Sequence, residues 1–240
     1  MPNDVKPTML SSVIYPESDG QPMTESDATR DYLTYCVEVL RLYFQSRQSI
    51  YVSGNLFIYY EEGNSKAVIS PDVFVIFGVS NRNRRSYKSW QESDKLPSFI
   101  IEITSRSTKK QDEVEKPQLY ASLGVAEYFQ YDPTADYLKP QLKGFCLVDG
   151  QYQPLPTEQT TNGTSFISSP ILGLDLQLQT TNQPTVGLVP LPKELRFYDP
   201  QTGLKLLSRQ EVEQALSQSE QRAERMAAML RELGINPDQV

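Results

Sequence analysis

The sequence predicts an α/β protein in which a mixed β-sheet is flanked by helices and followed by a separate C-terminal helix. One segment with helical spacing of apolar residues comes first, and several short runs of β-branched and aromatic residues follow it. A second helical segment lies between two of those runs. The order helix, strands, helix, strand is typical of an α/β core.

The first helix is expected over residues 28–47, where apolar residues recur at helical spacing. The preceding residues 1–25 are rich in Pro, Ser and Asp and predict an irregular lead-in. Thr24 and Ser26 are both suitable N-caps. Glu38 is an additional acid on this helix, and we expect it on the solvated face.

Seven runs of β-branched and aromatic residues predict strands, the first three of them antiparallel. They are residues 50–52, 56–60, 73–77, 99–103, 127–131, 144–148 and 172–176. Between the fourth and fifth runs, Thr108 and Gln111 form a capping pattern that predicts a helix from near Lys109 to Gly124. Pro117 lies inside this span, so the helix should either kink there or begin later.

Composition excludes several kinds of chemistry. The 240 residues include no histidine, which removes Ser-His-Asp and Cys-His hydrolysis and histidine-built zinc or iron sites. Cys36 and Cys146 match neither a metal cluster nor a disulfide framework, so we expect reduced thiols and a cytoplasmic protein. We expect neither secretion nor a membrane-spanning segment, because the first residues lack a basic region followed by a long apolar run and no run of about 18 apolar residues occurs. The net charge of −7 means that any nucleic acid must bind to a local basic patch.

Two acids stand in apolar surroundings, Asp72 after Pro71 and Glu102 within the fourth strand. A buried acid needs a partner, and two carboxylates near a lysine are suited to a magnesium-dependent phosphodiesterase. The loop between these strands, residues 80–95, carries basic residues with Tyr87 and Trp90 interleaved. The candidate contacts to DNA are Arg82, Arg84, Arg85 and Lys88. The alternative is a solvated loop whose Trp90 packs on the body of the protein.

An ordered set of residues from about 26 to 180 resembles the Uma-two family of proposed restriction endonucleases, a branch of the PD-(D/E)XK nuclease superfamily. The matching residues are Pro71-Asp72, Ile101 to Ser105 with Ser107-Thr108, Asp112, Lys116, Tyr120, Gly124-Val125, Glu127-Tyr128 and Asp132-Pro133. The resemblance implies a restriction-endonuclease-like fold in which Asp72 and Glu102 meet at one edge of the sheet.

The resemblance also implies a division of roles at that edge. Asp72, Glu102 and the backbone carbonyl of Ile103 are the expected ligands of Mg²⁺ or Mn²⁺. The superfamily's lysine normally stands two positions after the second acid, where this chain has Thr104. Lys116 on the following helix is therefore the catalytic candidate, with Lys109 and Lys110 as reserves. For Asp112 we expect a favourable place in the first helical turn, the alternative being support of Lys116.

The predicted organisation has four parts. Residues 1–25 are the lead-in, 26–180 the nuclease-like core, 181–205 a linker rich in Pro, Thr and Gln, and 206–240 a coiled-coil-like helix. The heptad positions of this helix are Val212, Leu216, Ser219, Ala223, Met226, Leu230 and Leu233. A homodimer through the core, the helix or both is expected, the alternative for the helix being docking on its own core.

Three functions remain compatible with the sequence. The first is a metal-dependent DNA endonuclease. The second is a catalytically weak or inactive DNA-binding relative, because the lysine has moved and the chain is acidic. The third is an oligomerising scaffold in which both acids are structural, Asp72 in a turn and Glu102 paired with a basic residue.

Overall fold

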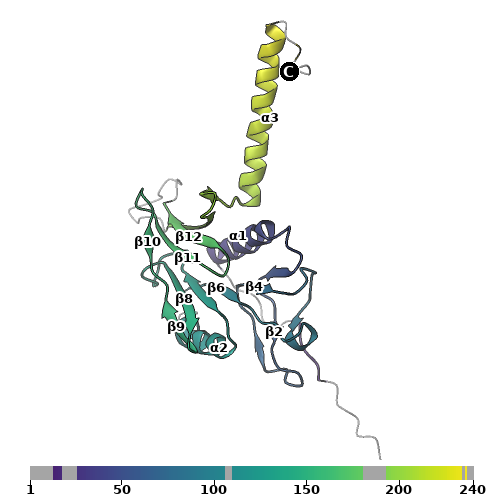
Figure 1. Cartoon of the computed structure of the whole chain (residues 1–240), viewed down its shortest axis with the longest axis vertical. Helices are drawn as coiled ribbons and strands as arrows, with labels where there is room; N and C mark the ends of the chain where they lie inside the picture. Colours follow the sequence, from purple (N-terminus) through teal and green to yellow (C-terminus); the bar gives the residue numbers. More distant parts are fainter. Residues whose placement is uncertain (1–12, 18–25, 106–109, 181–192, 234–235, 237–240) are drawn as a thin grey trace, which may run out of the picture.

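A computed structural model describes residues 13–17, 26–105, 110–180, 193–233 and 236 (Figure 1). The helical elements are α1 (Asp27–Tyr43), the 3₁₀ turn η1 (Ser89–Gln91), the π turn η2 (Gln111–Glu115), α2 (Lys116–Ser122) and α3 (Arg209–Glu232). The strands are β1 (Ile50–Ser53), β2 (Ile58–Tyr59), β3 (Val68–Ile69), β4 (Val73–Phe77), β5 (Tyr87–Lys88), β6 (Phe99–Ile103), β7 (Glu127–Tyr131), β8 (Leu142–Val148), β9 (Gln151–Pro154), β10 (Glu158–Gln159), β11 (Ser165–Ser169), β12 (Leu174–Gln179), β13 (Glu194–Asp199) and β14 (Leu204–Lys205).

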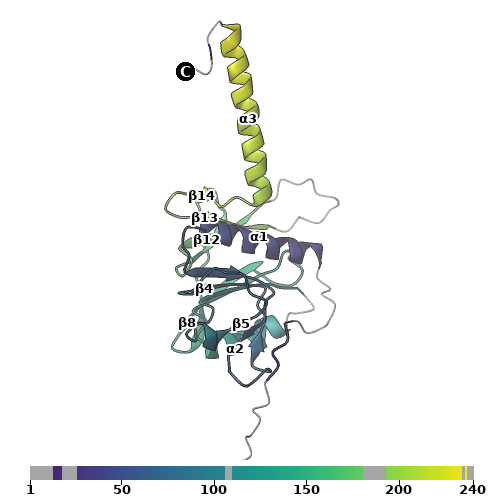
Figure 2. The ribbon, with the colours of Figure 1, turned by 90° about the vertical axis from the view of Figure 1, so that its right-hand side faces the viewer.

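The centre of the fold is a mixed six-stranded sheet in the order β1-β4-β6-β7-β8-β9. Strands β6 and β7 are parallel, and the other neighbours are antiparallel. A five-stranded antiparallel sheet, β10 to β14, and a three-stranded sheet, β3-β2-β5, accompany it. Figure 2 shows α1 and α2 on opposite faces of the central sheet. The expected α/β architecture, a mixed sheet flanked by helices, is confirmed.

Side chains alternate between two hydrophobic cores on the two faces of the central sheet, as the period of a strand requires. Phe99, Ile101 and Ile103 of β6 belong to the core that contains α1 and the five-stranded sheet. Ile100 belongs to the core that contains Tyr120 of α2. Glu102 has the same parity as Ile100 and therefore points toward α2.

The elements predicted from the sequence are largely present. Ser26 caps α1, its side chain accepting a hydrogen bond from the Thr29 N–H, and the helix ends at Tyr43, four residues earlier than expected. Each of the seven predicted runs contains a strand, although the second is reduced to β2. The cap predicted at Thr108 lies outside the described residues. The strands β3, β5, β9, β10 and β11 were not predicted.

The expected linker over residues 181–205 is wrong at its C-terminal end. Residues 194–199 form β13, which pairs with β12, and β14 pairs with β13. Leu195 and Phe197 alternate with polar neighbours and are fully buried, which anchors β13 to the core. The five-stranded sheet therefore extends past the predicted boundary at residue 180. Residues 181–192 lie outside the described part.

The C-terminal helix α3 extends away from the rest of the protein (Figures 1 and 2) and has no buried residue. Ser208 and Glu211 form a capping box at its start. None of the described helices combines the length and the apolar character that a bilayer-spanning segment needs.

Candidate active site

The register of the central sheet brings Asp72 and Glu102 together. Val73 of β4 pairs with Ile101 of β6 in an antiparallel ladder, and the next position in that register sets Asp72 opposite Glu102. Each lies two positions from a residue of the core on the α2 side, Phe74 or Ile100, so both side chains point to that face of the sheet. The Asp72 N–H lies 3.5 Å from Glu102 Oε2, and the Ile103 N–H donates to Asp72 Oδ2 at 2.8 Å. Acids separated by 30 positions in the sequence therefore share one site.

The chain turn after β1 fixes the backbone of Asp72. The Asn55 N–H donates to the Pro71 carbonyl at 3.0 Å. Gly54 packs against the carbonyl of Asp72 so closely that a Cβ atom there would lie 2.1 Å from its oxygen. A glycine is therefore required for this approach. The contact of Gly54 with Asp72 is visible only in the folded chain.

Lys116 completes the group from α2. Its Nζ lies 2.8 Å from Glu102 Oε2 and 2.8 Å from Asp112 Oδ1. The side chain keeps 27% of its exposure, whereas Glu102 and Asp112 are buried. Asp112 lies in the first turn of η2, as expected, but it is also buried and forms an ion pair with Lys116, which was the alternative. Of the reserve lysines, Lys110 is 86% exposed beside Glu115, and Lys109 lies outside the described residues.

Hydroxyl groups hold the remaining oxygens of the buried acids. The Tyr120 hydroxyl donates to Glu102 Oε1 at 2.6 Å. Thr104, which occupies the position of the superfamily's lysine, donates to Asp112 Oδ2 at 2.6 Å and contacts the Tyr137 hydroxyl. The sequence marked Tyr120 and Thr104 only as matching or departing from a family pattern. Their hydrogen bonds show that both orient the acids.

The site carries an excess of negative charge. Burial, followed by the charge of Glu102, raises the pKa of Asp72 well above its ordinary value, against the opposing effects of Lys116 and the Ile103 N–H. Burial alone would lower the pKa of Lys116, but Glu102, Asp112 and Asp72 together raise it above its ordinary value. Three carboxylates thus surround a lysine that stays charged. Within the described part of the chain, no other basic side chain comes within 4 Å of them.

The donor set fits a divalent cation. Asp72 and Glu102 are hard oxygen donors of the kind that Mg²⁺ and Mn²⁺ prefer, and a divalent cation would relieve the repulsion that raises the pKa of Asp72. No group of three or more acidic or cysteine side chains with the geometry of a metal site occurs among the described residues. A cation here would therefore also need backbone or water oxygens. Ile103 contacts Asp72 through its N–H, and ligation by its carbonyl stays a prediction.

A π turn delivers Lys116 to this place. In η2 the Lys116 N–H donates to the Gln111 carbonyl, five residues earlier, and α2 begins immediately afterwards. Pro117 has no N–H to donate, so the chain can change from π to α geometry there without losing a hydrogen bond. The predicted disturbance at Pro117 is therefore present as a wider turn before α2.

The four basic residues predicted to contact DNA lie in different surroundings. Arg84 is 5% exposed, binds Glu92 Oε1 through Nη2 at 2.9 Å, and stacks 4.2 Å from the Tyr51 ring centroid. The fold holds this side chain through Glu92 and Tyr51, and a phosphate contact of Arg84 stays a prediction. Arg82 also pairs with Glu92 but is 65% exposed.

The other two basic residues are at the surface. Arg85 is 86% exposed, with Glu17 3.5 Å away, and the Lys88 ammonium lies 4.7 Å from the Tyr15 ring centroid. The Trp90 ring packs on the ring of Tyr15, with 5.2 Å between the centroids. Contacts of Arg82, Arg85 and Lys88 with DNA stay predictions.

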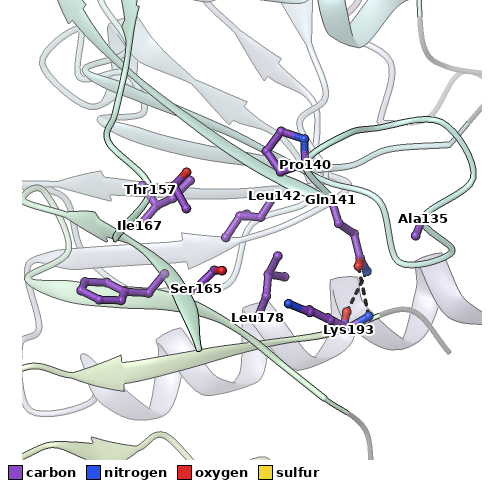
Figure 3. Close-up of a pocket in the computed structure, with 10 residues that line it drawn as sticks. Ala135, Pro140, Gln141, Leu142, Thr157, Ser165, Ile167, Leu178 and Lys193 are labelled. Atoms are coloured by element: carbon purple, nitrogen blue, oxygen red, sulfur yellow. Dashed lines mark hydrogen bonds between the residues drawn. The ribbon is translucent and has the colours of Figure 1, made fainter. Parts of the chain in front are cut away.

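A separate apolar cavity of about 320 Å³ lies between the central and five-stranded sheets (Figure 3). Leu142, Ile167 and Leu178 line it, and the Gln141 amide exchanges two hydrogen bonds with the backbone of Lys193. None of the clustered acids lines this cavity. The charged group at Asp72 and Glu102 is the better candidate for a chemical function.

A search of curated proteins finds no match to the chain. A crystal structure described as "a putative nuclease belonging to DUF820 from Anabaena variabilis ATCC 29413" is similar at 13% identity and a TM-score of 0.43, over 63% of this chain and 76% of that one. The model of the Uma2 family, described as "Putative restriction endonuclease", matches residues 14–181, which is well over half of the sequence, and this chain therefore belongs to the Uma2 family.

Proposed function

We propose that the protein is a metal-dependent DNA endonuclease that hydrolyses phosphodiester bonds at the site of Asp72, Glu102 and Lys116. The observation that supports this proposal best is the charge of the site. Lys116 forms ion pairs with Glu102 and Asp112, and Asp72 lies opposite Glu102 at one end of the neighbouring strands β4 and β6. Membership of the Uma2 family makes a nuclease the appropriate class.

Asp72 and Glu102, with the carbonyl of Ile103, would hold Mg²⁺ or Mn²⁺. Such a cation, when bound, neutralises charge on the phosphate and lowers the pKa of a water molecule. The Ile103 N–H holds Oδ2 of Asp72, and the Tyr120 hydroxyl holds Oε1 of Glu102. These two hydrogen bonds fix the orientation of both carboxylates, and with it the position of their second oxygens. The ligands are therefore held in place before any cation arrives.

Lys116 supplies the fixed positive charge of the site. Its raised pKa keeps the amine protonated at neutral pH, so it acts as a charged hydrogen-bond donor rather than as a general base. An ammonium group that is already held beside buried carboxylates is well placed to stabilise charge that develops on a phosphate oxygen. Its partial exposure allows contact with a substrate.

Cleavage of supercoiled plasmid in Mg²⁺ or Mn²⁺ tests the proposal. We expect Asp72→Asn and Glu102→Gln each to reduce the cleavage rate on the order of 100-fold or more, because each removes a ligand while conserving shape. Glu38→Gln is the matched control, since Glu38 is an exposed acid on α1 and should be neutral when replaced. Cleavage by wild type that both site variants retain would refute the site.

A DNA-binding protein with little or no activity is the second candidate, and Thr104 is the observation that favours it. Thr104 occupies the position at which members of the superfamily carry a lysine, and its hydroxyl donates a hydrogen bond to Asp112. Binding of duplex DNA without cleavage in either metal, at enzyme concentrations above the dissociation constant, would support this candidate over the first. Absence of both DNA and metal binding would leave the scaffold function.

We further propose that α3 associates with α3 of a second copy. Its heptad positions form one stripe along a capped helix that buries nothing against its own chain. Leu216, Met226 and Leu233 on this stripe are each more than half exposed. A heptad stripe fits a second identical helix, because the same positions meet across the axis of a coiled coil.

A further inference from the structure

The Lys116 ammonium lies equally close to two carboxylates, those of Glu102 and Asp112, and only Glu102 is a proposed metal ligand. The distances from Lys116 Nζ are 2.8 Å to Glu102 Oε2 and 2.8 Å to Asp112 Oδ1. Without a cation, Lys116 therefore occupies part of the coordination space of Glu102. A cation that engages Glu102 competes with Lys116 for the same oxygen, so the ammonium needs another partner to stay at the site.

Asp112 has the properties of such a partner. Its other carboxylate oxygen accepts a hydrogen bond from the Thr104 hydroxyl at 2.6 Å. Its backbone carbonyl accepts from the Tyr128 hydroxyl at 2.7 Å and from the Gln130 amide. The residue is 1% exposed. Three neighbours thus fix Asp112 independently of Lys116.

Asp112 is also distinct from the proposed ligands. Thr104 donates a hydrogen bond to its Oδ2, whereas its Oδ1 is buried and contacts Lys116 as an ion pair without accepting a hydrogen bond. Asp72 and Glu102 face each other across the β4–β6 ladder, whereas Asp112 lies in the π turn above the sheet. The two sets of contacts divide the three acids into a ligand pair and a separate anion.

We propose that Asp112 is a positioning residue, which retains the Lys116 ammonium beside the site when Glu102 is engaged by a divalent cation. This inference rests on the proposed metal site. The ligand pair cannot retain Lys116 in this way. Without Asp112, the ammonium would either leave the site when the cation binds or stay on Glu102 and block the cation. Thr104 in turn orients Asp112.

A double-mutant cycle with Mn²⁺ alone as the probe tests this role by calorimetry. Lys116→Met removes the competing ammonium and should strengthen Mn²⁺ binding in any background. If Asp112 holds the ammonium away from Glu102, this gain should be about tenfold larger in the Asp112→Asn background than in the wild-type background, because there Lys116 depends on Glu102 alone. Equal gains in both backgrounds, as expected from independent charges, would overturn the inference.

Kinetics on plasmid DNA give a second measurement. Asp112→Asn should lower kcat about tenfold or more while KM changes little, since Lys116 would be misplaced in the transition state. A loss of folded protein alone would lower the fraction of active enzyme but would leave the gains in Mn²⁺ affinity of the double-mutant cycle unchanged. Circular dichroism of each variant measures the folded fraction, so the two effects can be separated.

If Asp112→Asn does not fold, Thr104→Val replaces it in the double-mutant cycle with Lys116→Met. Thr104→Val removes the hydrogen bond that orients the Asp112 carboxylate but keeps its charge. Thr104→Ser should restore the wild-type values, since it keeps the hydroxyl. A wild-type protein that binds no Mn²⁺ would overturn the proposed function together with this inference. Normal Mn²⁺ binding with equal gains in the Asp112 and Thr104 cycles would overturn this inference alone.

Discussion

At the scale of single residues, the contact between Gly54 and the backbone of Asp72 leads to a testable consequence. A Cβ at Gly54 would meet the Asp72 carbonyl oxygen at 2.1 Å and Val37 Cγ2 at 3.0 Å. Because a backbone oxygen cannot move aside like the end of a side chain, Gly54→Ala must shift the Pro71-Asp72 segment. We expect a loss of about 1–3 kcal/mol in the free energy of unfolding and weaker Mn²⁺ binding.

Chemical denaturation and calorimetry measure these two effects. Gly63→Ala is the control, because Gly63 has a φ of +84° but no heavy atom within 4 Å of an added Cβ. This control should lose stability through backbone strain and keep its Mn²⁺ affinity. If Gly54→Ala binds Mn²⁺ as tightly as Gly63→Ala does, the contact does not position Asp72.

In the absence of metal, the ionised side chain of Asp72 should lower the free energy of unfolding. Its pKa is raised in the folded protein by burial and by Glu102. The folded state therefore holds this proton more tightly than the unfolded chain, and stability falls as pH rises above the unfolded value of about 3.9. Asp72→Asn should accordingly raise the free energy of unfolding at pH 7 by on the order of 1 kcal/mol in EDTA.

Thermal melts with and without Mn²⁺ distinguish this effect from a general stabilisation. Wild type should gain stability on addition of Mn²⁺, whereas Asp72→Asn should gain little, because one ligand is lost. The advantage of Asp72→Asn in EDTA should also shrink as pH falls toward 4. A variant less stable than wild type in EDTA at pH 7 would contradict the assigned repulsion between the two acids.

At the scale of elements, the sequence predicted the parts of the fold that have strong local patterns. The strands β4, β6 and β7 are rich in apolar and aromatic residues because both of their faces are covered. The two-residue strands β3 and β5 carry too little periodicity to be recognised. Strand β13 was missed because its alternation of buried and polar residues follows a segment rich in Pro and Thr, and its pairing with β12 is a long-range property.

The candidate site was predictable to a similar extent. Asp72 and Glu102 stand out because a carboxylate in an apolar strand needs a partner, and the family pattern indicated Lys116. The burial of Asp112 was not predictable, since an acid in a first helical turn is usually solvated. Its enclosure depends on Thr104, which follows β6 directly, and on Tyr128 and Gln130 of β7.

At the scale of the whole molecule, the notable feature is a helix that makes no buried contact with the body. The 24 residues of α3 span about 36 Å, and such a helix is marginal in isolation. Exposed apolar residues along one stripe, including Leu216 and Met226, need to be covered in water. A dimer through α3 would cover them and would provide two active sites, one for each strand of a DNA duplex.

Mass measurement by light scattering tests this association in the full chain. Wild type should have twice the mass of one chain at micromolar concentration, and Leu216→Glu/Met226→Glu should be monomeric, because buried charge at core heptad positions prevents pairing. The variant Gln214→Glu/Gln221→Glu adds the same charge on the outer face of α3 and should stay dimeric. A chain truncated after Leu207 keeps β14 and should be a folded monomer. A monomeric wild type, or a dimer that survives the Leu216 and Met226 changes, would exclude α3 as the interface.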